Sequence, residues 1–226
     1  MQSARVRQMF GSIAKRYDLA NHLLSCGVDF YWRKRAAEIV ASWRPDKIVD
    51  LATGTGDLAL VLQRKLPEAE VVGVDFLPEM LTLAQKKGVV QTILADAMKL
   101  PFPDASFDSV TIAFGLRNME NWQRALAEMS RVLKRNGHLL VLEFGLPTGS
   151  ILRTIYRFYL HRCLPVIGSF LTGKKSAYDY LGDSIEEFPR GQAMINLIEA
   201  SGFTKATFQP LSWGIATIYT AQNVGV

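Results

Sequence analysis

The sequence predicts an α/β fold in which helices cover both faces of a mostly parallel β-sheet. The chain has 226 residues, which fits one domain because a single hydrophobic core stops growing at about 250–300 residues. From residue 45, short apolar runs alternate with segments of helical period. The run Leu139–Phe144 is almost continuously apolar, as strands buried on both faces are. Strands that alternate with helices in this way predict a doubly wound parallel sheet.

Five strands and three helices are expected between residues 45 and 145. The expected strands are Lys47–Ala52, Glu70–Asp75, Thr92–Ala95, Phe107–Phe114 and His138–Phe144. The expected helices are Asp57–Lys65, Pro78–Lys87 and Glu120–Lys134. Pro78 suits a first helical turn, whose N–H groups have no partner within the helix. We expect Asn136 and Gly137 to end the last helix, because both accept the left-handed conformation of a helix C-terminus.

The two ends of the chain depart from this alternation. Residues 1–44 have apolar residues at helical spacing and are predicted to be helices. Residues 146–190 contain three prolines and many aromatic residues, and we interpret them as an insertion. A helix (Gln192–Ser201) and two strands (Phe203–Gln209 and Ile215–Ala221) follow. The two strands are expected to extend the sheet at one edge in antiparallel fashion, which gives seven strands in one domain, 1–226.

Composition excludes several classes of protein. Hydrophobic residues make up 49% of the chain and charged residues 21%, which excludes a disordered or collagen-like chain. The two cysteines, Cys26 and Cys163, exclude a disulfide-rich scaffold and a CxxC zinc site. The N-terminus lacks the apolar segment of a secretory signal, and no run approaches the ~20 apolar residues of a membrane span. We therefore expect a cytoplasmic protein.

A glycine-rich loop is the clearest candidate for a binding site. The segment Asp50–Asp57 (DLATGTGD) follows a strand and opens a helix. Gly54 and Gly56 allow a tight turn and a close approach of the backbone to a ligand. The free N–H groups of the helix favour an anionic group there. The spacing differs from the GxGxxG of dinucleotide folds, and no GK[ST] for a triphosphate follows.

Two further aspartates follow the second and third expected strands. Asp75 comes 19 residues after Gly56, where a carboxylate accepts hydrogen bonds from both hydroxyls of a ribose. Asp96 and Ala97 follow the third strand, where a carboxylate can accept a hydrogen bond from an adenine amino group. Each aspartate alone could equally be a helix cap or a turn residue. Together with Asp50, they predict a nucleoside site at the carboxyl edge of the sheet.

These motifs resemble those of the Rossmann-like class I S-adenosylmethionine (SAM) methyltransferases, although Ala52 stands where most of them have glycine. Over nearly the whole chain, the sequence resembles the ubiquinone/menaquinone biosynthesis C-methyltransferase family. The stretches that carry this resemblance are YDLAN from Tyr17, LLS from Leu23, WRK from Trp32, DLATGTGD, FGLRN from Phe114, RVLK from Arg131, LVLEF from Leu140, LPVIG from Leu164 and YDYL from Tyr178. DLATGTGD matches this family's own version of the loop, which accounts for Ala52.

The resemblance implies that SAM donates a methyl group to a ring carbon of a polyprenylated quinol, either 2-demethylmenaquinol or a ubiquinol precursor. The sequence does not choose between these two substrates. The resemblance also implies cofactor contacts at Thr53, Gly54, Thr55, Gly56, Asp75, Asp96, Ala97 and Ala113. Arg117, Asn118 and Tyr17 are the candidate catalytic residues. His22, His138 and His161 are scattered without ligand spacing, so no metal site is expected.

Arg117 is the strongest catalytic candidate. A phenol has a pKa near ~10, so the site must favour the ring anion that makes a ring carbon nucleophilic. Arginine stays charged and is a poor base, but it can stabilise a quinolate, and Asn118 can hydrogen-bond a ring oxygen. Alternatively, Arg117 pairs with a carboxylate such as Asp50 and orders its loop. Tyr17 either lines the site or packs in the core.

The net charge of +5 is unevenly placed, because two basic segments of +5 each are offset by a net −5 in the rest of the chain. Residues 1–44 carry eight Lys and Arg against three Asp and Glu, and residues 151–175 carry five against none. Arg153, Arg157 and His161 form one stripe of an expected helix, among apolar and aromatic residues. A basic amphipathic helix suits a membrane surface, which predicts peripheral contact with lipid at the inner face of the cytoplasmic membrane. Alternatively, this helix is a lid with solvated arginines.

Residues 1–44 are accordingly expected to be a helical cover and residues 146–190 a helical lid over one methyltransferase domain. Three alternatives differ in class. The first is a SAM methyltransferase that acts on another small phenolic or lipid substrate, or at an oxygen or nitrogen centre. The second is an RNA-binding protein or RNA methyltransferase, which the large apolar residues within the basic segments disfavour. The third is a non-catalytic scaffold, which the intact motifs disfavour. Whether the chain forms a homo-oligomer is left open by the sequence.

Overall fold

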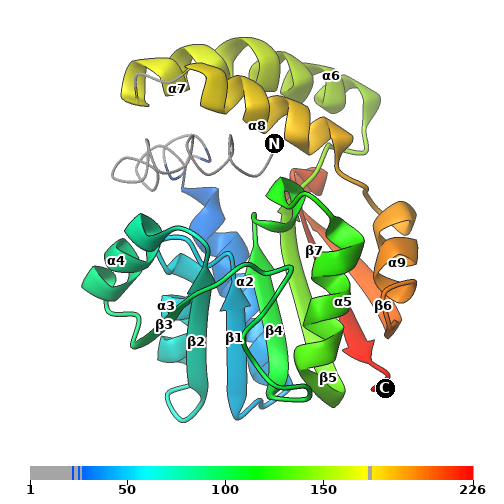
Figure 1. Cartoon of the computed structure of the whole chain (residues 1–226). Coiled ribbons are helices and arrows are strands. Elements are labelled where there is room, and N and C mark those ends of the chain that lie inside the picture. The colour runs from blue at the N-terminus through cyan, green and yellow to red at the C-terminus, as the bar shows by residue number, and fades with distance from the viewer. Residues whose placement is uncertain (1–21, 23–24, 26, 173–174, 226) are drawn as a thin grey trace.

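A computed structural model describes residues 22, 25, 27–172 and 175–225 of the chain. Seven strands form one sheet in the order β3-β2-β1-β4-β5-β7-β6 (Figure 1). The strands are β1 (Lys47–Leu51), β2 (Glu70–Asp75), β3 (Gln91–Leu94), β4 (Phe107–Ala113), β5 (Leu133–Phe144), β6 (Phe203–Leu211) and β7 (Ala216–Asn223). The pairs from β3 to β5 are parallel, and β7 pairs antiparallel with both β5 and β6. The predicted seven-stranded, mostly parallel sheet with an antiparallel addition at one edge is confirmed.

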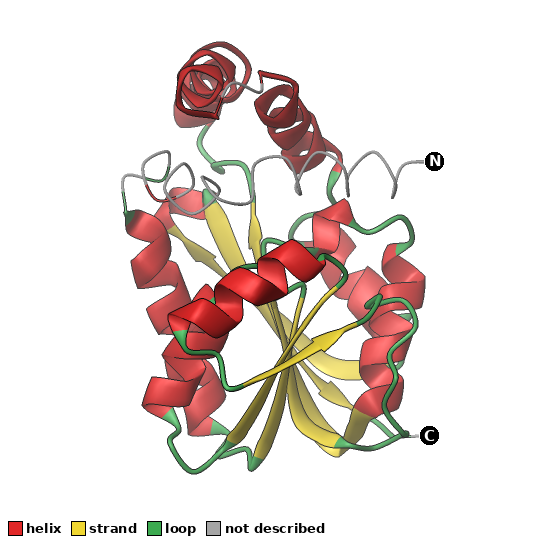
Figure 2. Ribbon diagram, turned by 60° about the vertical axis from the view of Figure 1, so that its left-hand side comes forward, coloured by secondary structure: helices red, strands yellow, loops and turns green. Residues whose placement is uncertain are grey.

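Helices cover both faces of the sheet, as Figure 2 shows. One face carries α2 (Val28–Ser42), α3 (Asp57–Lys65) and α4 (Pro78–Lys87), and the other carries α5 (Trp122–Val132) and α9 (Gln192–Glu199). Successive β1 residues point to opposite faces, so Ile48 packs in the α2–α3 cluster and Val49 in the α5–α9 cluster. This arrangement explains why apolar residues of β1 are buried on both faces of the sheet.

The predicted end of α5 at Asn136 and Gly137 is wrong. The helix ends at Val132. Leu133 already belongs to β5, where it pairs with Phe107 of β4. The next pair is His138 with Ser109, so β5 holds extra residues between the two pairs. Asn136 has φ +62° within this irregularity. Its tolerance of the left-handed conformation therefore serves a β-bulge and not a helix C-terminus.

The predicted insertion is helical where it is described. It consists of α6 (Ser150–Phe158), a π-helical turn (Tyr159–Cys163), α7 (Leu164–Thr172) and α8 (Lys175–Glu187). These helices form a separate layer above the sheet (Figure 1). Leu160, Leu164, Tyr178 and Ile185 form a hydrophobic cluster of their own in this layer. Within the described chain, none of the helices combines the length and hydropathy that crossing a bilayer requires.

Candidate active site

A polar pocket opens where the strand order reverses, between β1 and β4. In doubly wound sheets, this reversal leaves a crevice at the carboxyl ends of the strands. The pocket is lined by residues that follow β1, β2 and β4, together with Arg33 from α2. The predicted cofactor residues Thr53, Gly54, Thr55, Asp75 and Ala113 all line it. These five predicted residues therefore share one pocket at the carboxyl edge of the sheet.

The glycine loop has the geometry that a close ligand requires. Gly54 has φ +57°, and a Cβ placed on it would meet no atom within 4 Å, so its missing side chain leaves space in the pocket. Gly56 has φ +87°, and its Cβ would lie 2.3 Å from a methyl carbon of Val89. Gly54 therefore keeps room for a ligand, whereas Gly56 allows α3 to pack against the chain after α4.

Asp75 is positioned by backbone donors at the end of β2. Its Oδ2 accepts the Gly54 N–H at 2.8 Å and its Oδ1 accepts the Leu77 N–H at 2.9 Å. Burial raises the pKa of Asp75, and these backbone hydrogen bonds oppose the shift. The carboxylate retains lone pairs for further donors, as the sequence argument requires.

Asp96 and Ala97 lie beside this pocket and are not among the described residues that line it. Asp96 is exposed and accepts the Met98 N–H at 2.8 Å, the hydrogen bond of a local turn. Ala97 is buried in the core. Their link to the site lies just after β3, where the Ala95 N–H donates to the Asp75 carbonyl.

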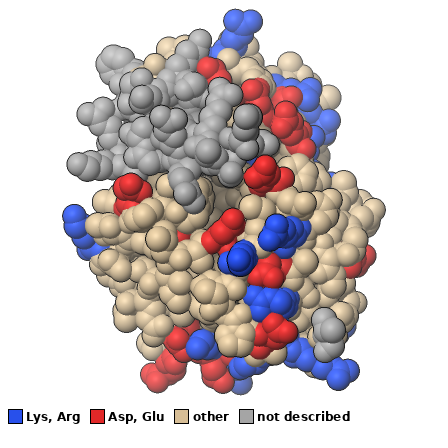
Figure 3. Space-filling view, in the orientation of Figure 1, with Lys and Arg blue, Asp and Glu red and all other residues tan. Residues whose placement is uncertain are grey.

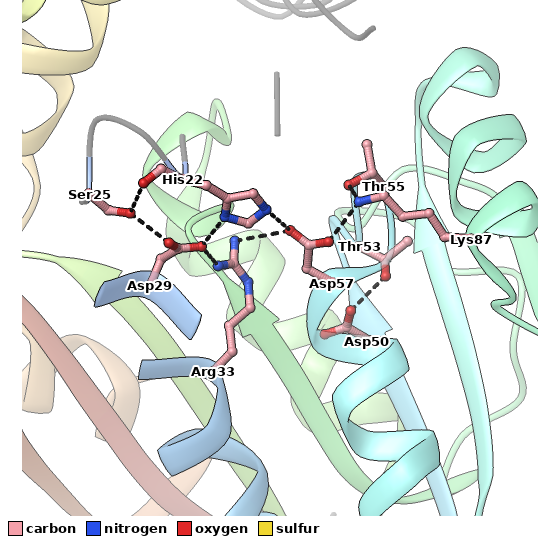
Figure 4. A network of polar contacts seen from close by, with 9 residues as sticks. All are labelled: His22, Ser25, Asp29, Arg33, Asp50, Thr53, Thr55, Asp57 and Lys87. Carbon is pink, nitrogen blue, oxygen red and sulfur yellow. Dashed lines mark hydrogen bonds and ion pairs between the residues drawn. The ribbon is translucent and has the colours of Figure 1, made fainter. Parts of the chain in front are cut away.

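Asp50 is a fully buried carboxylate beneath the loop. Its oxygens accept the Thr53 hydroxyl at 2.6 Å and the Thr111 hydroxyl at 2.7 Å (Figure 4 draws the first). Burial raises the pKa of Asp50 to about 6, and the two threonines and the charge of Arg33 oppose this rise. Asp50 does not pair with Arg117.

A second, apolar cavity of about 330 Å³ lies between the sheet and the lid helices. Its walls come from α2, from the ends of β4 and β5, and from the lid layer. Aromatic side chains contribute much of the lining: Trp32, Phe114, Phe144, Tyr156, Tyr159, Tyr178, Tyr180 and Trp213. Such a cavity suits a flat, largely apolar ligand.

Arg117 lines this cavity and is buried against a carboxylate. Its Nη1 donates to Glu143 Oε1 at 2.6 Å and also to the Phe114 carbonyl. The Arg117 side chain is 3% exposed and that of Glu143 0%. The Nε of Arg117 is buried and has no hydrogen-bond acceptor among the described residues. The expectation of a carboxylate partner was right in kind, but the partner is Glu143 and not Asp50.

Three residues line both cavities: Arg33, Phe114 and Asn118. The amide of Asn118 donates to the Phe114 carbonyl at 3.3 Å, and its buried Oδ1 has no donor among the described residues. Phe114 has φ +58°, a conformation that bulky residues adopt only when the surrounding structure holds them in it. The two cavities therefore meet at the start of FGLRN.

The structure adds residues that sequence reasoning missed, and one candidate cannot be placed. Tyr17 lies outside the described residues. Glu143 could have been found from the sequence, since it is a charged residue within an otherwise apolar strand. Tyr180 lies in the YDYL stretch but was given no role there, and Tyr156 had no signal, because aromatic residues are dense throughout the insertion. No group of three or more metal-ligating side chains occurs in the part of the chain that the structure describes.

Solved structures identify the class of fold. A SAM-dependent methyltransferase of Thermotoga maritima matches with a TM-score of 0.70 at 18% identity, over 96% of this chain and 99% of that one. Human N-acetylserotonin methyltransferase in complex with SAM matches with a TM-score of 0.65 at 18% identity, over 96% of this chain and 58% of that one. The fold is that of class I SAM methyltransferases.

Sequence relatives define the family more narrowly. The ubiE/COQ5 methyltransferase family matches residues 1–223, and the chain belongs to it. A demethylmenaquinone methyltransferase of Thermus thermophilus is 47% identical over 95% of this chain and all of the relative. A ubiquinone/menaquinone biosynthesis C-methyltransferase of Geobacter sulfurreducens is 43% identical over 97% of this chain and 88% of the relative. The predicted family, enzyme class and SAM cofactor are confirmed.

The polar pocket fits SAM chemically. SAM carries a sulfonium and an ammonium, and carboxylates of Asp50, Asp57 and Asp75 line the pocket. Leu77 and Met80 give part of its wall an apolar surface for a base. Gly54 leaves the space that a close cofactor needs. The donor set and the shape of the pocket thus suit a nucleoside with a cationic tail.

Proposed function

We propose that this chain transfers the methyl group of SAM to a ring carbon of 2-demethylmenaquinol, or of the corresponding ubiquinol precursor. The observation that carries this proposal is the junction of a polar, carboxylate-lined pocket with an apolar, aromatic cavity at Phe114 and Asn118. The full-length matches to relatives with these activities support it. Another small phenolic or lipid substrate is the alternative, and the size of the aromatic cavity favours a ring with an apolar tail.

The cavity opposes ionisation of a phenol. Tyr156 is a phenol in this cavity, and burial raises the pKa of its hydroxyl, with a further rise from Tyr159 and a decrease caused by Arg117. Burial raises the pKa of Tyr180 too, and Arg117 again opposes it. A quinol hydroxyl placed among these residues meets the same environment. It therefore needs a local donor to stabilise its anion.

We propose that Arg117 and Asn118 supply this stabilisation. Because Glu143 neutralises the charge of Arg117, we infer that Arg117 acts as a fixed N–H donor toward the quinolate oxygen, through its unpartnered Nε. Asn118 orients the ring from the junction. SAM supplies the methyl group from its sulfonium. With SAM bound, a C–C bond would form as the S–C bond breaks, and the ring carbon would then lose its proton to solvent.

For the cofactor, we propose that Asp75 holds the ribose and the backbone from Thr53 to Gly56 holds the methionine end. Asp96 and Ala97 are proposed at the adenine edge and Ala113 beside the sulfonium. Tyr17 is proposed as part of the cover over the quinol. The cover (1–44) and the lid (146–190) belong with one methyltransferase domain in this proposal.

We propose peripheral contact of the lid with lipid at the inner face of the cytoplasmic membrane. Ile151, Ile155 and Phe158 are 78%, 59% and 62% exposed on one face of α6. Two residues of the basic stripe contact α8 instead. Arg157 Nε lies 2.9 Å from Glu186 of α8, and His161 Nε2 lies 3.2 Å from the same carboxylate. The apolar face of α6, and not the basic stripe, is therefore the proposed contact.

We do not propose a nucleic-acid partner. On the described part of the face in Figure 3, basic and acidic side chains are interspersed, whereas nucleic-acid sites gather positive charge in a patch or stripe. A cytoplasmic location fits the quinol substrate and the proposed lipid contact. A homo-oligomer is compatible with all of these proposals and is not required by any of them.

The test is product analysis with purified protein, SAM and short-chain demethylmenaquinol. We expect a product that keeps its added methyl group after oxidation to the quinone, which a C-methyl does and an O-methyl does not. Parallel turnover of the ubiquinol precursor ranks the two substrates. Exclusive O-methylation, or no turnover of either quinol, would contradict the proposal.

The role of Arg117 needs a variant that keeps the core neutral. Arg117→Ala alone leaves Glu143 buried without its cationic partner, at a cost of about 3–5 kcal/mol. We therefore pair Arg117→Met with Glu143→Gln and expect a folded protein whose kcat falls about 100-fold or more. Binding of S-adenosylhomocysteine by calorimetry should change less than about 3-fold. Near-normal turnover would remove Arg117 from the reaction.

A further inference from the structure

Arg33 is a buried arginine that lines both cavities and to which neither the motifs nor the proposed reaction gives a role. We propose that Arg33 binds the α-carboxylate of SAM. This inference rests on the proposed function in one respect, the assignment of the polar pocket to the cofactor. It adds a cofactor-binding residue from α2, outside the glycine loop and the strand ends.

Arg33 is held in place from two sides. Its Nη1 donates to Asp29, one turn earlier in α2 (Figure 4). Its guanidinium carbon lies 5.3 Å from the centre of the Phe114 ring. The side chain is 10% exposed, so most of its hydration is gone. Asp29 in turn accepts from Ser25 at 2.6 Å and contacts His22 at 2.6 Å.

The other side of the guanidinium is left for a ligand. Its Nη2 lies 3.7 Å from Asp57 Oδ2, which is an ion pair but too long for a hydrogen bond. Among the described residues, the bond to Asp29 is the one hydrogen bond that the Arg33 side chain donates. A guanidinium has five N–H donors in a fork that matches a carboxylate. Arg33 therefore has donors to spare, facing the polar pocket.

The orientation of SAM in the polar pocket places its carboxylate near the junction of the two cavities. Asp75, Leu77 and Met80 line the polar pocket alone, so the adenosine lies away from the junction. The sulfonium must lie at the junction, because it has to reach a ring in the apolar cavity. The carboxylate is joined to the sulfonium by a short chain and must stay near the junction, where Arg33 lies.

The charges around the pocket select Arg33 over other cations. Arg33 is the one basic residue among the described residues that line the polar pocket, beside three aspartates. Lys87 is nearby, but its Nζ donates to Thr55 at 2.9 Å and to Asp57 at 2.7 Å (Figure 4), and it is not a lining residue. The methionine end of SAM carries one cation and one anion. Arg33 can take its carboxylate, and Asp57 can take its ammonium.

The experiment compares SAM with decarboxylated SAM, which keeps the sulfonium and the ammonium but lacks the carboxylate. Affinities are measured by calorimetry for the wild type and for Arg33→Met combined with Asp29→Asn, which avoids a buried unpaired Asp29. We expect the wild type to bind SAM about 10- to 100-fold more tightly than decarboxylated SAM. The double variant should bind the two about equally, with its affinity for decarboxylated SAM unchanged.

Two controls make the result specific. Arg35→Met removes a half-buried arginine of the same helix that pairs with Glu38 and lines neither cavity, and it should leave both affinities unchanged. Asp75→Asn should weaken both ligands alike. If the Arg33 variant loses affinity for both ligands in parallel, or keeps the preference for SAM, the proposal is overturned. If Asp75→Asn changes neither affinity, the pocket assignment itself fails, and the Arg33 proposal falls with it.

Discussion

Buried charged residues concentrate where the two cavities meet, and each has a defined partner. Arg117 pairs with Glu143 and Arg33 with Asp29, and each of these four side chains is at most 10% exposed. A buried ion pair costs desolvation and contributes little net stability. Because Arg117 lines the apolar cavity and Arg33 lines both cavities, the two pairs point to positioning of ligands, since stability alone would favour apolar residues there.

Asp50 makes a pH dependence testable at the residue scale. Its pKa is about 6 in the folded protein against a model-compound value of 3.8, so the folded state keeps a proton that the unfolded state loses. The free energy of unfolding should therefore decrease as pH rises from about 4 to about 6, by about 3 kcal/mol from this group. Above pH 6, this contribution becomes constant.

The measurement is urea unfolding of the ligand-free protein from pH 4 to 7.5. Asp50→Asn cannot ionise, so it should gain stability relative to the wild type as pH rises across this window. Other carboxyl groups titrate in both proteins and cancel in the difference. Parallel pH profiles for the two proteins would show that Asp50 is not the group responsible.

At the scale of elements, the site depends on two loops that pack against each other. Ala52 after β1 has φ +48°, which explains why glycine is usual at this position in the class. A Cβ on Gly115, after β4, would lie 2.6 Å from the Ala52 Cβ. The glycine of FGLRN is thus required by the alanine of DLATGTGD, a dependence that neither motif reveals alone.

The contact between the Ala52 Cβ and a Cβ on Gly115 predicts that substitutions at these two positions compensate for each other. Gly115→Ala should destabilise the protein by about 1–3 kcal/mol through overpacking and should weaken binding of S-adenosylhomocysteine, because the loop after β1 must shift. Adding Ala52→Gly should restore at least half of the lost stability, since it removes the closest atom. Thermal unfolding of the four proteins of this cycle measures the coupling. Strictly additive effects would show that the two loops do not interact in this way.

Elements were predictable wherever local signals and tertiary structure agreed. The bounds of α3, α4 and β2 match the expected ranges because each has a local boundary signal, such as Pro78 in the first turn of α4. The end of α5 was not predictable from Asn136 and Gly137. A left-handed residue serves a helix C-terminus and a β-bulge equally well, and only the pairing of Leu133 with Phe107 decides between them.

At the scale of the whole molecule, the lid layer (α6, the π-helical turn, α7 and α8) exposes an apolar face of α6. Ile155 and Phe158 are exposed there, whereas Arg157 and His161 contact Glu186. We expect the protein to cosediment with anionic vesicles at low salt. Ile155→Ser combined with Phe158→Ser should reduce binding about 10-fold or more, because burying such side chains contributes about 1.5–3 kcal/mol each.

The matched control removes two apolar side chains elsewhere. Val90 and Phe208 are 77% and 44% exposed outside the lid, and Val90→Ser with Phe208→Ser should bind vesicles as the wild type does. Failure of the wild type to bind at low salt would contradict the lipid contact. Equal losses in both double variants would show that binding is not specific to the lid.

The sequence by itself determined the fold class, the glycine loop and the place of Asp50 and Asp75 at the carboxyl edge, because these depend on local periodicity and on motifs of adjacent residues; it also singled out Arg117 as a catalytic candidate. Only the tertiary structure decided the partners: Glu143 for Arg117, Thr111 for Asp50, and Arg33 at the junction of the cavities. These contacts join residues that are 26 or more positions apart or come from different elements. Their geometry follows from the order and twist of the strands, which no local pattern in the chain records.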